Sequence, residues 1–424
     1  MSKNQIISAI DIGTTKITTL IASLADESEK INIIGVANQP AKGLRKSQIV
    51  DIEETIESIT QSVEAAERMA GYSISSSLAS IAGSHIESIN SKGVVAVAEP
   101  EGEISQHDVA RVIEAARAVS LPSSRDILHV IPRDFKVDSQ EGVKDPVGMS
   151  GIRLEAEAHI ITGSSTAMRN ISKCISEIGV EIDSLVFSGL ASAEAVLTPT
   201  EKELGVVLVD LGGGSTAMAV FVEGALSYSV VLPVGAKNIT NDLAIGLRVS
   251  LETAEKIKIG LSKMEKKAQD DDEDDELDPK KLGLSEEVSK LSRKTLTEGI
   301  IKPRLNEIFN MIGEELKKSG LGGTTPAGVV VTGGGALTAG LETSCKRSLS
   351  LPVRIGYPKG LSGLVDEIKS PAFATSWGLI SYGVKNFKGI KSDSSLKAVG
   401  KVISKIPVKG VFDKGIKLIK SFLP

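Results

Sequence analysis

The stretches DIGTTK, residues 11–16, and DLGGGST, residues 210–216, decide the fold of this chain. Each follows a short apolar run, 6–10 in the first case and 206–209 in the second, and each opens with an aspartate, an aliphatic residue and a glycine. A short apolar run that ends at turn residues predicts a buried strand. We therefore expect two related strand–turn units, one near the N-terminus and one in the second half.

The residue types of the first stretch suit a phosphate group. Gly13 lets the backbone approach a ligand closely, and Thr14 and Thr15 offer hydroxyl and backbone donors. Lys16 adds a positive charge. Asp11 is placed to hold Mg²⁺ through water, since Mg²⁺ keeps several waters beside few carboxylates. The same residues are also compatible with a simple hairpin that carries a solvated lysine.

The second stretch repeats this chemistry after Asp210. Gly212, Gly213 and Gly214 expose a run of N–H groups that can surround an anion. The alternative is a tight hairpin turn without a ligand, which is the weaker interpretation because three glycines lose much backbone entropy on folding.

A third glycine turn lies in VVVTGGGALTAGL, residues 329–341. A predicted strand runs into Gly333, Gly334, Gly335 and Ala336 and then into a helix start, a shape that suits close contact with a nucleoside or phosphate. A strand–turn–helix unit without a ligand is the alternative. Neither G-x-x-x-x-G-K-[ST] nor a complete G-x-G-x-x-G occurs, which disfavours a P-loop or a dinucleotide fold.

Composition bounds the function classes. The 424 residues allow two domains or one bilobed domain, and the net charge of -5 gives no global argument for nucleic-acid binding. Two cysteines and four scattered histidines show no metal-ligand spacing. The polar N-terminus does not resemble a signal peptide, and no apolar run is long enough to predict a spanning helix.

Two segments interrupt the expected sheets. Between 85 and 161 we expect a mixed α/β insertion: strands at 93–98, 127–131, 135–137 and 156–161, and a helix that Ser105 and Asp108 open as a capping box and Pro122 ends. Further helices are expected at 52–69 and near 167–178. Residues 270–278 hold eight acidic side chains, a block that repels itself and predicts a solvated loop tip.

The C-terminal region changes character. Nine lysines stand against two aspartates between 388 and 420, and 386–408 predicts a flexible basic linker. Residues 409–424 predict an amphipathic helix lying in the plane of an anionic membrane surface; packing on the protein's own core is the alternative. Its apolar side holds Phe412, Ile416, Ile419, Phe422 and Leu423, and its basic side Lys414, Lys417 and Lys420.

Together these motifs resemble the actin, sugar-kinase and heat-shock chaperone superfamily, in which two related lobes clamp ATP and Mg²⁺. Within it the chain resembles the FtsA family of bacterial cell-division proteins. The resemblance lies in the segment ISQHDVARVIEAARAVSLPSSRDILHVIPRDFKVD, in GVVLVDLGGGSTAMAVFVEGAL and in the basic tail. It implies an α/β, bilobed actin-like ATPase fold with a first lobe of 1–84 and 162–204, the insertion, a second-lobe core of 205–240 and 325–385, and an outer subdomain of 241–324.

The resemblance also implies roles for residues. Asp11 to Lys16 and Asp210 to Gly214 would form the two phosphate loops, with Asp11 and Asp210 holding Mg²⁺ through water, and Gly333 to Ala336 would line the adenosine. Glu252 and Lys256 would approach the adenine or ribose; their alternative is an exposed i, i+4 helix pair. Ser188 and Gly189 stand where a water-positioning carboxylate is expected, so ATP hydrolysis should be slow at most.

The implied function is a self-polymerising ATP-binding protein that tethers the tubulin-like protein FtsZ to the inner face of the cytoplasmic membrane and recruits later division proteins. A sugar-type kinase would need a substrate-side aspartate and a polar cleft, for which we find no signature. A chaperone would need a large peptide-binding domain that the chain lacks. A pilus-assembly adaptor of similar fold is the nearest alternative, and the tail favours division.

Overall fold

The computed structural model describes residues 5–24, 31–98, 102–267, 276–277 and 291–392. The predicted acidic loop lies almost entirely outside these residues, as do most of the predicted linker and the whole predicted membrane helix, 409–424. The chain divides into two compact units, Met1–Val384 and Lys385–Pro424, and the fold described below is that of the first.

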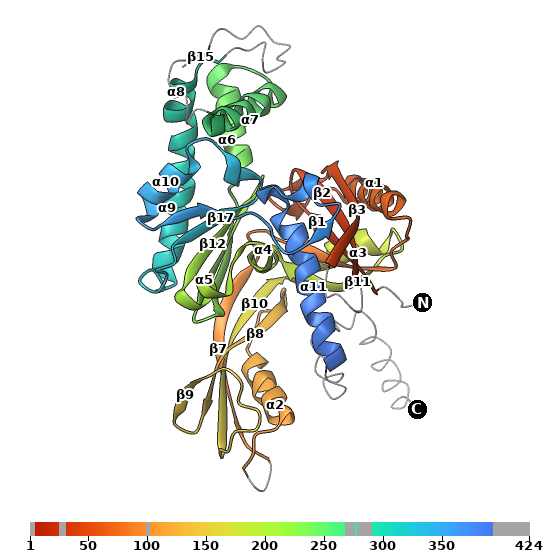
Figure 1. The fold of residues 1–424 in the computed structure, drawn as a ribbon, viewed down its shortest axis with the longest axis vertical. Helices are drawn as coiled ribbons and strands as arrows, with labels where there is room; N and C mark the ends of the chain where they lie inside the picture. Colours follow the sequence, from red (N-terminus) through yellow and green to blue (C-terminus); the bar gives the residue numbers. More distant parts are fainter. Residues whose placement is uncertain (1–4, 25–30, 99–101, 268–275, 278–290, 393–424) are drawn as a thin grey trace, which may run out of the picture. The chain divides into compact units, whose positions relative to one another are not determined.

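Two sheets of this unit, both visible in Figure 1, contain the same five-strand arrangement, to which the first sheet adds one edge strand. In each, three strands form an antiparallel meander, the first of them has a parallel neighbour, and a further strand pairs in parallel with that neighbour. The first sheet runs β11 (Glu181–Phe187), β6 (Ser76–Ile81), β1 (Gln5–Ile12), β2 (Lys16–Leu24), β3 (Ile31–Pro40) and β19 (Ser362–Gly363). The second runs β18 (Val353–Ile355), β17 (Val329–Thr332), β12 (Val206–Leu211), β13 (Thr216–Val222) and β14 (Ala225–Leu232). This repetition confirms the prediction of two related lobes.

Helices cover the first sheet. α1 (Ile52–Ala70) confirms the helix expected at 52–69 and packs on β2 and β3. Its Asp51 side chain accepts from the N–H of Glu54, and Gly71 ends it in the left-handed conformation, as N-terminal Asx and C-terminal glycine caps do. The remaining helices of this lobe are α3 (Ser165–Ser176), α4 (Ser188–Val196) and α11 (Ala374–Ser392), and a small ribbon pairs β4 (Leu44–Arg45) with β5 (Gln48–Ile49).

The second lobe is built around β12, all of whose residues are buried. A strand buried on both faces reads as a continuous apolar run, which is why the sequence identified it. α9 (Lys302–Lys318) adds the fully buried Leu305, Ile308, Phe309 and Ile312 to this core. The other elements are α5 (Pro199–Leu204), α6 (Ala236–Leu247), α7 (Leu251–Lys267), β15 (Glu276–Leu277), β16 (Leu291–Ser292), α8 (Arg293–Leu296), the π-helix η2 (Thr297–Ile301) and α10 (Leu341–Leu349), with the 3₁₀ turns η3 (Gly334–Leu337), η4 (Asp366–Ile368) and η5 (Pro371–Phe373).

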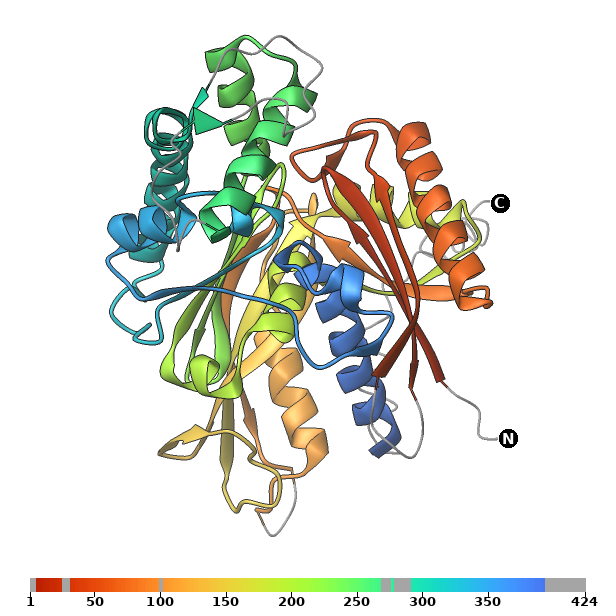
Figure 2. The same ribbon diagram turned by 45° about the horizontal axis from the view of Figure 1, so that its top comes forward.

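The insertion is a separate sheet with one helix, drawn at the lower end of Figure 2. Its strand order is β7 (Glu87–Ala96), β10 (Arg153–Ser164), β8 (Arg125–Val137) and β9 (Gln140–Val143). α2 (Gln106–Arg117) carries the expected capping box of Ser105 and Asp108, and it ends before Pro122. The cluster of Ile104, Val112, Phe135, Val137, Val143, Leu154 and Ala156 forms its own small core.

The prediction of two strands at 127–131 and 135–137 was wrong, because β8 runs through both. Glu157 pairs with Asp134 and Ala158 with Pro132, so Arg133 is the extra residue of a β-bulge. A bulge lets the strand continue past Pro132, which has no N–H to give to the ladder.

The assignment of all of 325–385 to the second lobe also needs correction. Ser362 and Gly363 of β19 pair with Asn32 and Ile33 of β3, which covers the edge of the first sheet. α11 approaches Ile7 and Leu78 of the first sheet at Gly383, where a Cβ atom would lie 2.5 Å from Leu78 Cδ1. The helix continues to Ser392, past the expected start of the linker at 386, because no helix-breaking proline interrupts this stretch.

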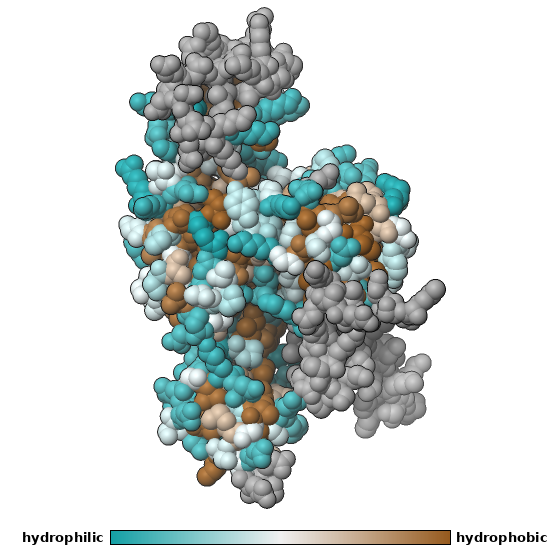
Figure 3. Space-filling model, in the orientation of Figure 1, coloured by the Kyte–Doolittle hydropathy of each residue, from teal (hydrophilic) through white to brown (hydrophobic). Residues whose placement is uncertain are grey.

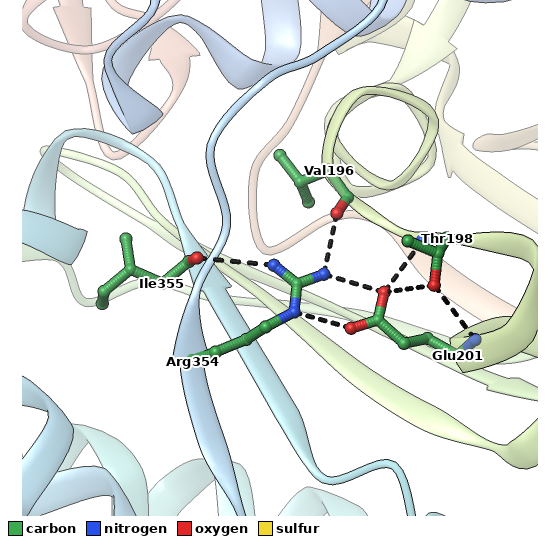
Figure 4. Close-up of polar contacts among 5 residues, drawn as sticks. All are labelled: Val196, Thr198, Glu201, Arg354 and Ile355. Atoms are coloured by element: carbon green, nitrogen blue, oxygen red, sulfur yellow. Dashed lines mark hydrogen bonds and ion pairs between the residues drawn. The ribbon is translucent and has the colours of Figure 1, made fainter.

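The chain passes from the first lobe to the second after α4 and returns to the first lobe between β18 and β19. Arg354 of β18 bonds to the segment that follows α4 and so connects the two passages (Figure 4). Its guanidinium donates to both carboxylate oxygens of Glu201, at 2.6 and 2.8 Å, and to the carbonyl of Val196 at 2.9 Å. Val196 ends α4, so a cation caps the carbonyl end of that helix. This pairing lowers the pKa of Glu201 to about 2.

Candidate functional site

A pocket lies where the turns of the two sheets meet. It contains about 650 Å³ of space that protein atoms do not fill, part of it open to solvent. Segments far apart in the sequence are brought to one place there. The predicted site residues that line it are Asp11, Gly13, Thr14, Thr15, Lys16, Asp210, Gly212, Gly213, Gly333 and Gly334.

The two loops of the pocket have the same geometry. Ile12 pairs with Ile17 and Leu211 with Thr216, so each hairpin closes over four residues. The N–H of Gly13 donates to the carbonyl of Lys16 at 3.0 Å, and that of Gly212 to the carbonyl of Ser215 at 3.0 Å. A Cβ atom on either glycine would lie 2.8 or 2.9 Å from that same carbonyl oxygen. The close approach explains why both loops place glycine at this position.

The loops touch each other across the cleft. Gly214 packs on Thr14, where a Cβ atom would lie 2.7 Å from Thr14 Oγ1, and Gly213 packs on Thr15. Ser47 Oγ lies 3.1 Å from Thr14 Oγ1 and 2.7 Å from Ser215 Oγ. We call this chain of Thr14, Ser47 and Ser215 the hydroxyl bridge; it joins the first lobe to the second.

The second loop turns its carbonyl groups away from the pocket. The carbonyls of Gly212 and Gly213 accept from the N–H groups of Ala236 and Lys237, at 2.9 and 2.8 Å, at the start of α6. In the described part of the chain, the N–H groups of Gly213 and Gly214 donate to no protein acceptor. A run of backbone N–H groups left open in this way is suited to an anion.

Two carboxylates, the half-buried Asp11 and the buried Asp210, face the pocket from equivalent strand ends. Asp11 Oδ1 accepts from Ser80 Oγ at 2.8 Å, and Asp210 Oδ2 accepts from Ser192 Oγ at 2.6 Å and Thr375 Oγ1 at 3.0 Å. Burial raises the pKa of Asp11 to about 6 and also raises the pKa of Asp210. Two desolvated carboxylates at one site are unfavourable without a cation.

These carboxylates fit a magnesium site that also uses water and phosphate. A Cβ atom at Gly333 would overlap Asp210 Oδ1, so the glycine leaves that oxygen uncovered. Mg²⁺ is usually held by one or two carboxylates together with waters and substrate phosphates. Within the described residues no group of three or more acidic, histidine or cysteine side chains is placed to hold a metal by itself.

Lys16 is the cation of the first loop. Burial lowers its pKa to about 8, and the charges of Asp11 and Asp210 oppose that shift. Its Nζ lies 3.2 Å from the centroid of the Phe373 ring.

Part of the third glycine turn lies outside the pocket. Gly333 has a φ of 88°, and its N–H donates to the carbonyl of Pro371 at 3.1 Å. Gly335 lies under α6, where a Cβ atom would come within 2.9 Å of Ala236 Cβ, and Ala336 is buried. These two residues allow close packing and do not line the pocket.

Glu252 and Lys256 are not brought to the pocket. They lie on α7 and pair with each other, with Lys256 Nζ 2.8 Å from Glu252 Oε1 and the Glu252 side chain 78% exposed. The buried polar face of α7 belongs to other residues. Lys258 Nζ donates to Glu255 Oε2 at 2.7 Å and to Thr240 Oγ1 at 2.9 Å.

Several residues of the site were missed by reasoning from the sequence. Ser80 and Ser192 hold the two carboxylates, and Ser47 joins the loops. Ala372 of η5 and Thr375 at the start of α11 close the pocket. Ser188, noted in the sequence for the absence of a carboxylate, also lines the pocket. No local motif marks these hydroxyl residues, whose partners lie far along the chain.

Comparison with known proteins agrees with this geometry. The family model described as "Cell division protein FtsA" matches residues 207–378, and the model "SHS2 domain inserted in FTSA" matches 83–162. FtsA of Pseudomonas aeruginosa is 37% identical over 399 residues, 91% of each chain. FtsA of Borreliella burgdorferi is 39% identical over 417 residues, which cover 98% of this chain and 99% of the relative.

Solved structures show the same fold at low sequence identity. MreB 5 of Spiroplasma citri, bound to AMPPNP, has a TM-score of 0.55 at 13% identity, over 92% of this chain and 98% of the other. A PilM-PilN type IV pilus biogenesis complex reaches 0.61 at 14%, over 89% of this chain and 98% of the other. With duplicated lobes, an inserted SHS2 domain and relatives of this similarity, the chain belongs to the FtsA family of cell division proteins and has the actin-like ATPase fold.

Proposed function

We propose that this chain binds ATP and Mg²⁺, polymerises head to tail, and tethers FtsZ to the cytoplasmic face of the membrane at the division site, where it recruits later division proteins. The observation that carries the nucleotide part is the pocket formed by both glycine loops and the carboxylates of Asp11 and Asp210. The MreB structures of the same fold, with AMPPNP and with ADP, support it.

In this proposal each lobe contributes one phosphate loop. The N–H groups of Gly213 and Gly214 and the ammonium of Lys16 bind phosphate oxygens. Asp11 and Asp210 hold Mg²⁺ through water, and the cation neutralises the two carboxylates and the phosphates together. Gly333 and Gly334 leave room beside Asp210 for the rest of the nucleotide.

We propose that Glu255 and Lys258 approach the nucleoside in place of Glu252 and Lys256. Lys258 is only 8% exposed and is held by Glu255 and by Thr240 of α6. α6 is the helix whose first N–H groups bind the second loop. In this proposal Glu255 and Lys258 extend the same side of the site.

Hydrolysis should be slow at most. Among the described residues, Asp11 and Asp210 are the only acidic residues at the pocket wall, and hydroxyl donors hold both. Ser188 lines the pocket, and Glu194 pairs with Lys202 at 2.6 Å outside its lining. A serine can hydrogen-bond a water but is a poor general base.

The membrane part of the proposal rests on the tail sequence. In the described part of the chain no helix has the length and apolar character needed to cross a bilayer. Each lysine of an amphipathic tail contributes only about 1 kcal/mol near anionic lipid. A single tail should therefore bind weakly and reversibly. Many tails on one filament would bind far more firmly through multivalency. Attachment and polymerisation would therefore support each other.

The insertion is proposed as the surface for later division proteins. Apolar colour reaches the surface over this domain in Figure 3, and its exposed apolar side chains include Val94, Val147 and Ile152. Surface patches of this kind often mark binding sites for partner proteins.

Co-pelleting with anionic vesicles, with and without ATP and Mg²⁺, tests the proposal. The full chain is compared with a chain ending at Ser392, where α11 ends, and with Phe412→Glu, for which Phe412→Leu is the matched control. We expect the full chain and the leucine variant to pellet more strongly with ATP, and the other two to stay in solution. Equal pelleting of all four proteins would refute the tail assignment.

A further inference from the structure

The segment from Pro371 to Thr375 touches both lobes at the pocket. The carbonyl of Pro371 accepts from Gly333 N–H at 3.1 Å, and Thr375 Oγ1 donates to Asp210 Oδ2 at 3.0 Å, so the segment is bonded to the second lobe. Between these contacts, Phe373 lies over Lys16 of the first lobe.

The backbone of Phe373 is fixed on both sides. Its N–H donates to the carbonyl of Ser370 at 3.0 Å, and its carbonyl accepts from Ser376 Oγ at 3.0 Å. The segment is also held at Pro371 and Thr375. The ring therefore has a defined position, and Lys16 is the longer and more adaptable partner of the pair.

An ammonium group has three N–H donors, and the ring face occupies only one side of it. Lys16 lines the pocket while its Nζ lies 3.2 Å from the ring centroid. The contact is compatible with a ligand on the other side of the ammonium. An ammonium group that contacts a neutral ring is not neutralised by it and can still bind an anion. A carboxylate partner would instead compete with that anion.

We propose that Phe373 is a positioning residue of the nucleotide site, whose ring holds the Lys16 ammonium toward the polyphosphate and away from Asp11 and Asp210. The inference rests on the proposed binding of ATP. Without the ring, the ammonium turns to the nearby carboxylates, whose charges already act on it. The phosphate group then loses a positively charged partner, and the Lys16 ammonium competes with Mg²⁺ for Asp11 and Asp210.

The test is ATP binding to the full chain, measured by titration calorimetry with Mg²⁺ present. Phe373→Leu and Phe373→Met keep an apolar side chain but remove the π face, and Phe373→Tyr keeps it. We expect the leucine and methionine variants to bind ATP about threefold to tenfold more weakly, and the tyrosine variant to bind like the parent chain. Adenosine, which has no phosphate, should bind all four proteins alike.

A double-mutant cycle with Lys16→Ala separates positioning from packing. If the ring acts through Lys16, Phe373→Leu has no further effect on ATP affinity once the lysine is removed. Equal losses with and without Lys16, or a tyrosine variant as weak as the leucine variant, would overturn the inference. If the parent chain itself binds no ATP, the proposed function fails instead, so the two failures are distinguishable. Thermal unfolding of each variant identifies any that does not fold, and the methionine variant then replaces the leucine variant.

Discussion

Gly213 of the second loop packs against the side chain of Thr15 of the first, so closely that a Cβ atom on the glycine would overlap Thr15 Cγ2. The contact joins residues from the two lobes. The width of the cleft is therefore set by a glycine on one side and a threonine on the other.

Gly213→Ala should push the two loops apart and weaken ATP binding. A Cβ atom cannot fit unless Thr15 or its loop moves, and the N–H groups of Gly213 and Gly214 are then displaced from the phosphate that they are proposed to bind. We expect at least about a tenfold loss in affinity, since a loss of 1.4 kcal/mol in binding free energy is tenfold. Titration calorimetry measures it. Gly323→Ala is the control, because nothing lies within 4 Å of a Cβ atom at Gly323. Unchanged affinity in Gly213→Ala would contradict the observed contact.

Acid should destabilise the contact between the insertion and the second lobe. His159 is buried, with its ring nitrogens 2.6 Å from Asn90 Oδ1 and 3.0 Å from Ser229 Oγ. Burial, together with the charges of Arg133 and His129, lowers its pKa to about 3. The unfolded chain takes up the proton near pH 6.5, so stability from this group is complete above that pH. It falls by about 1.4 kcal/mol per pH unit between pH 6.5 and pH 3.

His159→Gln should reduce this dependence, because glutamine keeps a hydrogen-bonding side chain and does not titrate. Melting temperatures between pH 7.5 and 5 measure the effect. His107→Gln, at an exposed position on α2, should leave the curve as it is. A His159→Gln curve parallel to that of the parent chain would show that another group controls acid stability.

Arg354→Lys should not replace the arginine. A lysine cannot donate to both oxygens of Glu201 and to the carbonyl of Val196 in the same planar geometry. We expect a loss of about 1–2 kcal/mol, moderated by partial solvent exposure of the pair, seen as a melting temperature lower by a few degrees. Arg347→Lys on the exposed side of α10 is the matched control. Equal melting temperatures for the two variants would mean that the Arg354 contacts add no stability.

Gly93→Ala should loosen α2 and leave the nucleotide site intact. A Cβ atom there would overlap the backbone of Val112, because α2 packs directly on β7. No described residue of 85–161 lines the pocket. Hydrogen exchange of residues 106–117 should accelerate, and ATP affinity should stay within about twofold, since sites without shared contacts act independently. Lys92→Val is the neighbouring control. A fall in the ATP affinity of Gly93→Ala that accompanies the faster exchange of α2 would show that the insertion and the nucleotide site are coupled.

Local chemistry made part of this site predictable. Asp11 and Asp210 were identified because a carboxylate, a glycine and hydroxyl residues follow a buried strand within a few positions. Their partners Ser80, Ser192 and Thr375 come from other elements, with sequence separations of 69, 18 and 165 residues. Such contacts depend on how elements pack, which no local pattern records.

Two other predictions show what local sequence patterns leave open. Glu252 and Lys256 have the correct i, i+4 spacing for neighbours on α7, but that pair lies on the exposed face while Lys258 lies on the buried one. The i, i+4 spacing predicts which residues are neighbours on a helix, but it does not predict whether they lie on its exposed or its buried face. The strand expected at 127–131 continues through Pro132, because a bulge there accommodates the proline and has no sequence signal of its own.

The hydroxyl bridge of Thr14, Ser47 and Ser215 has a consequence for how quickly the cleft exchanges its contents. Each of its groups can trade its partner for a water molecule at small net cost, and none carries a charge. Separating these three hydroxyl groups moves no proton. The bridge itself therefore adds no dependence on salt or on pH to the opening of the cleft. The residence time of a bound molecule is set by its own contacts, so the lifetime of the closed form is a property of the ligand.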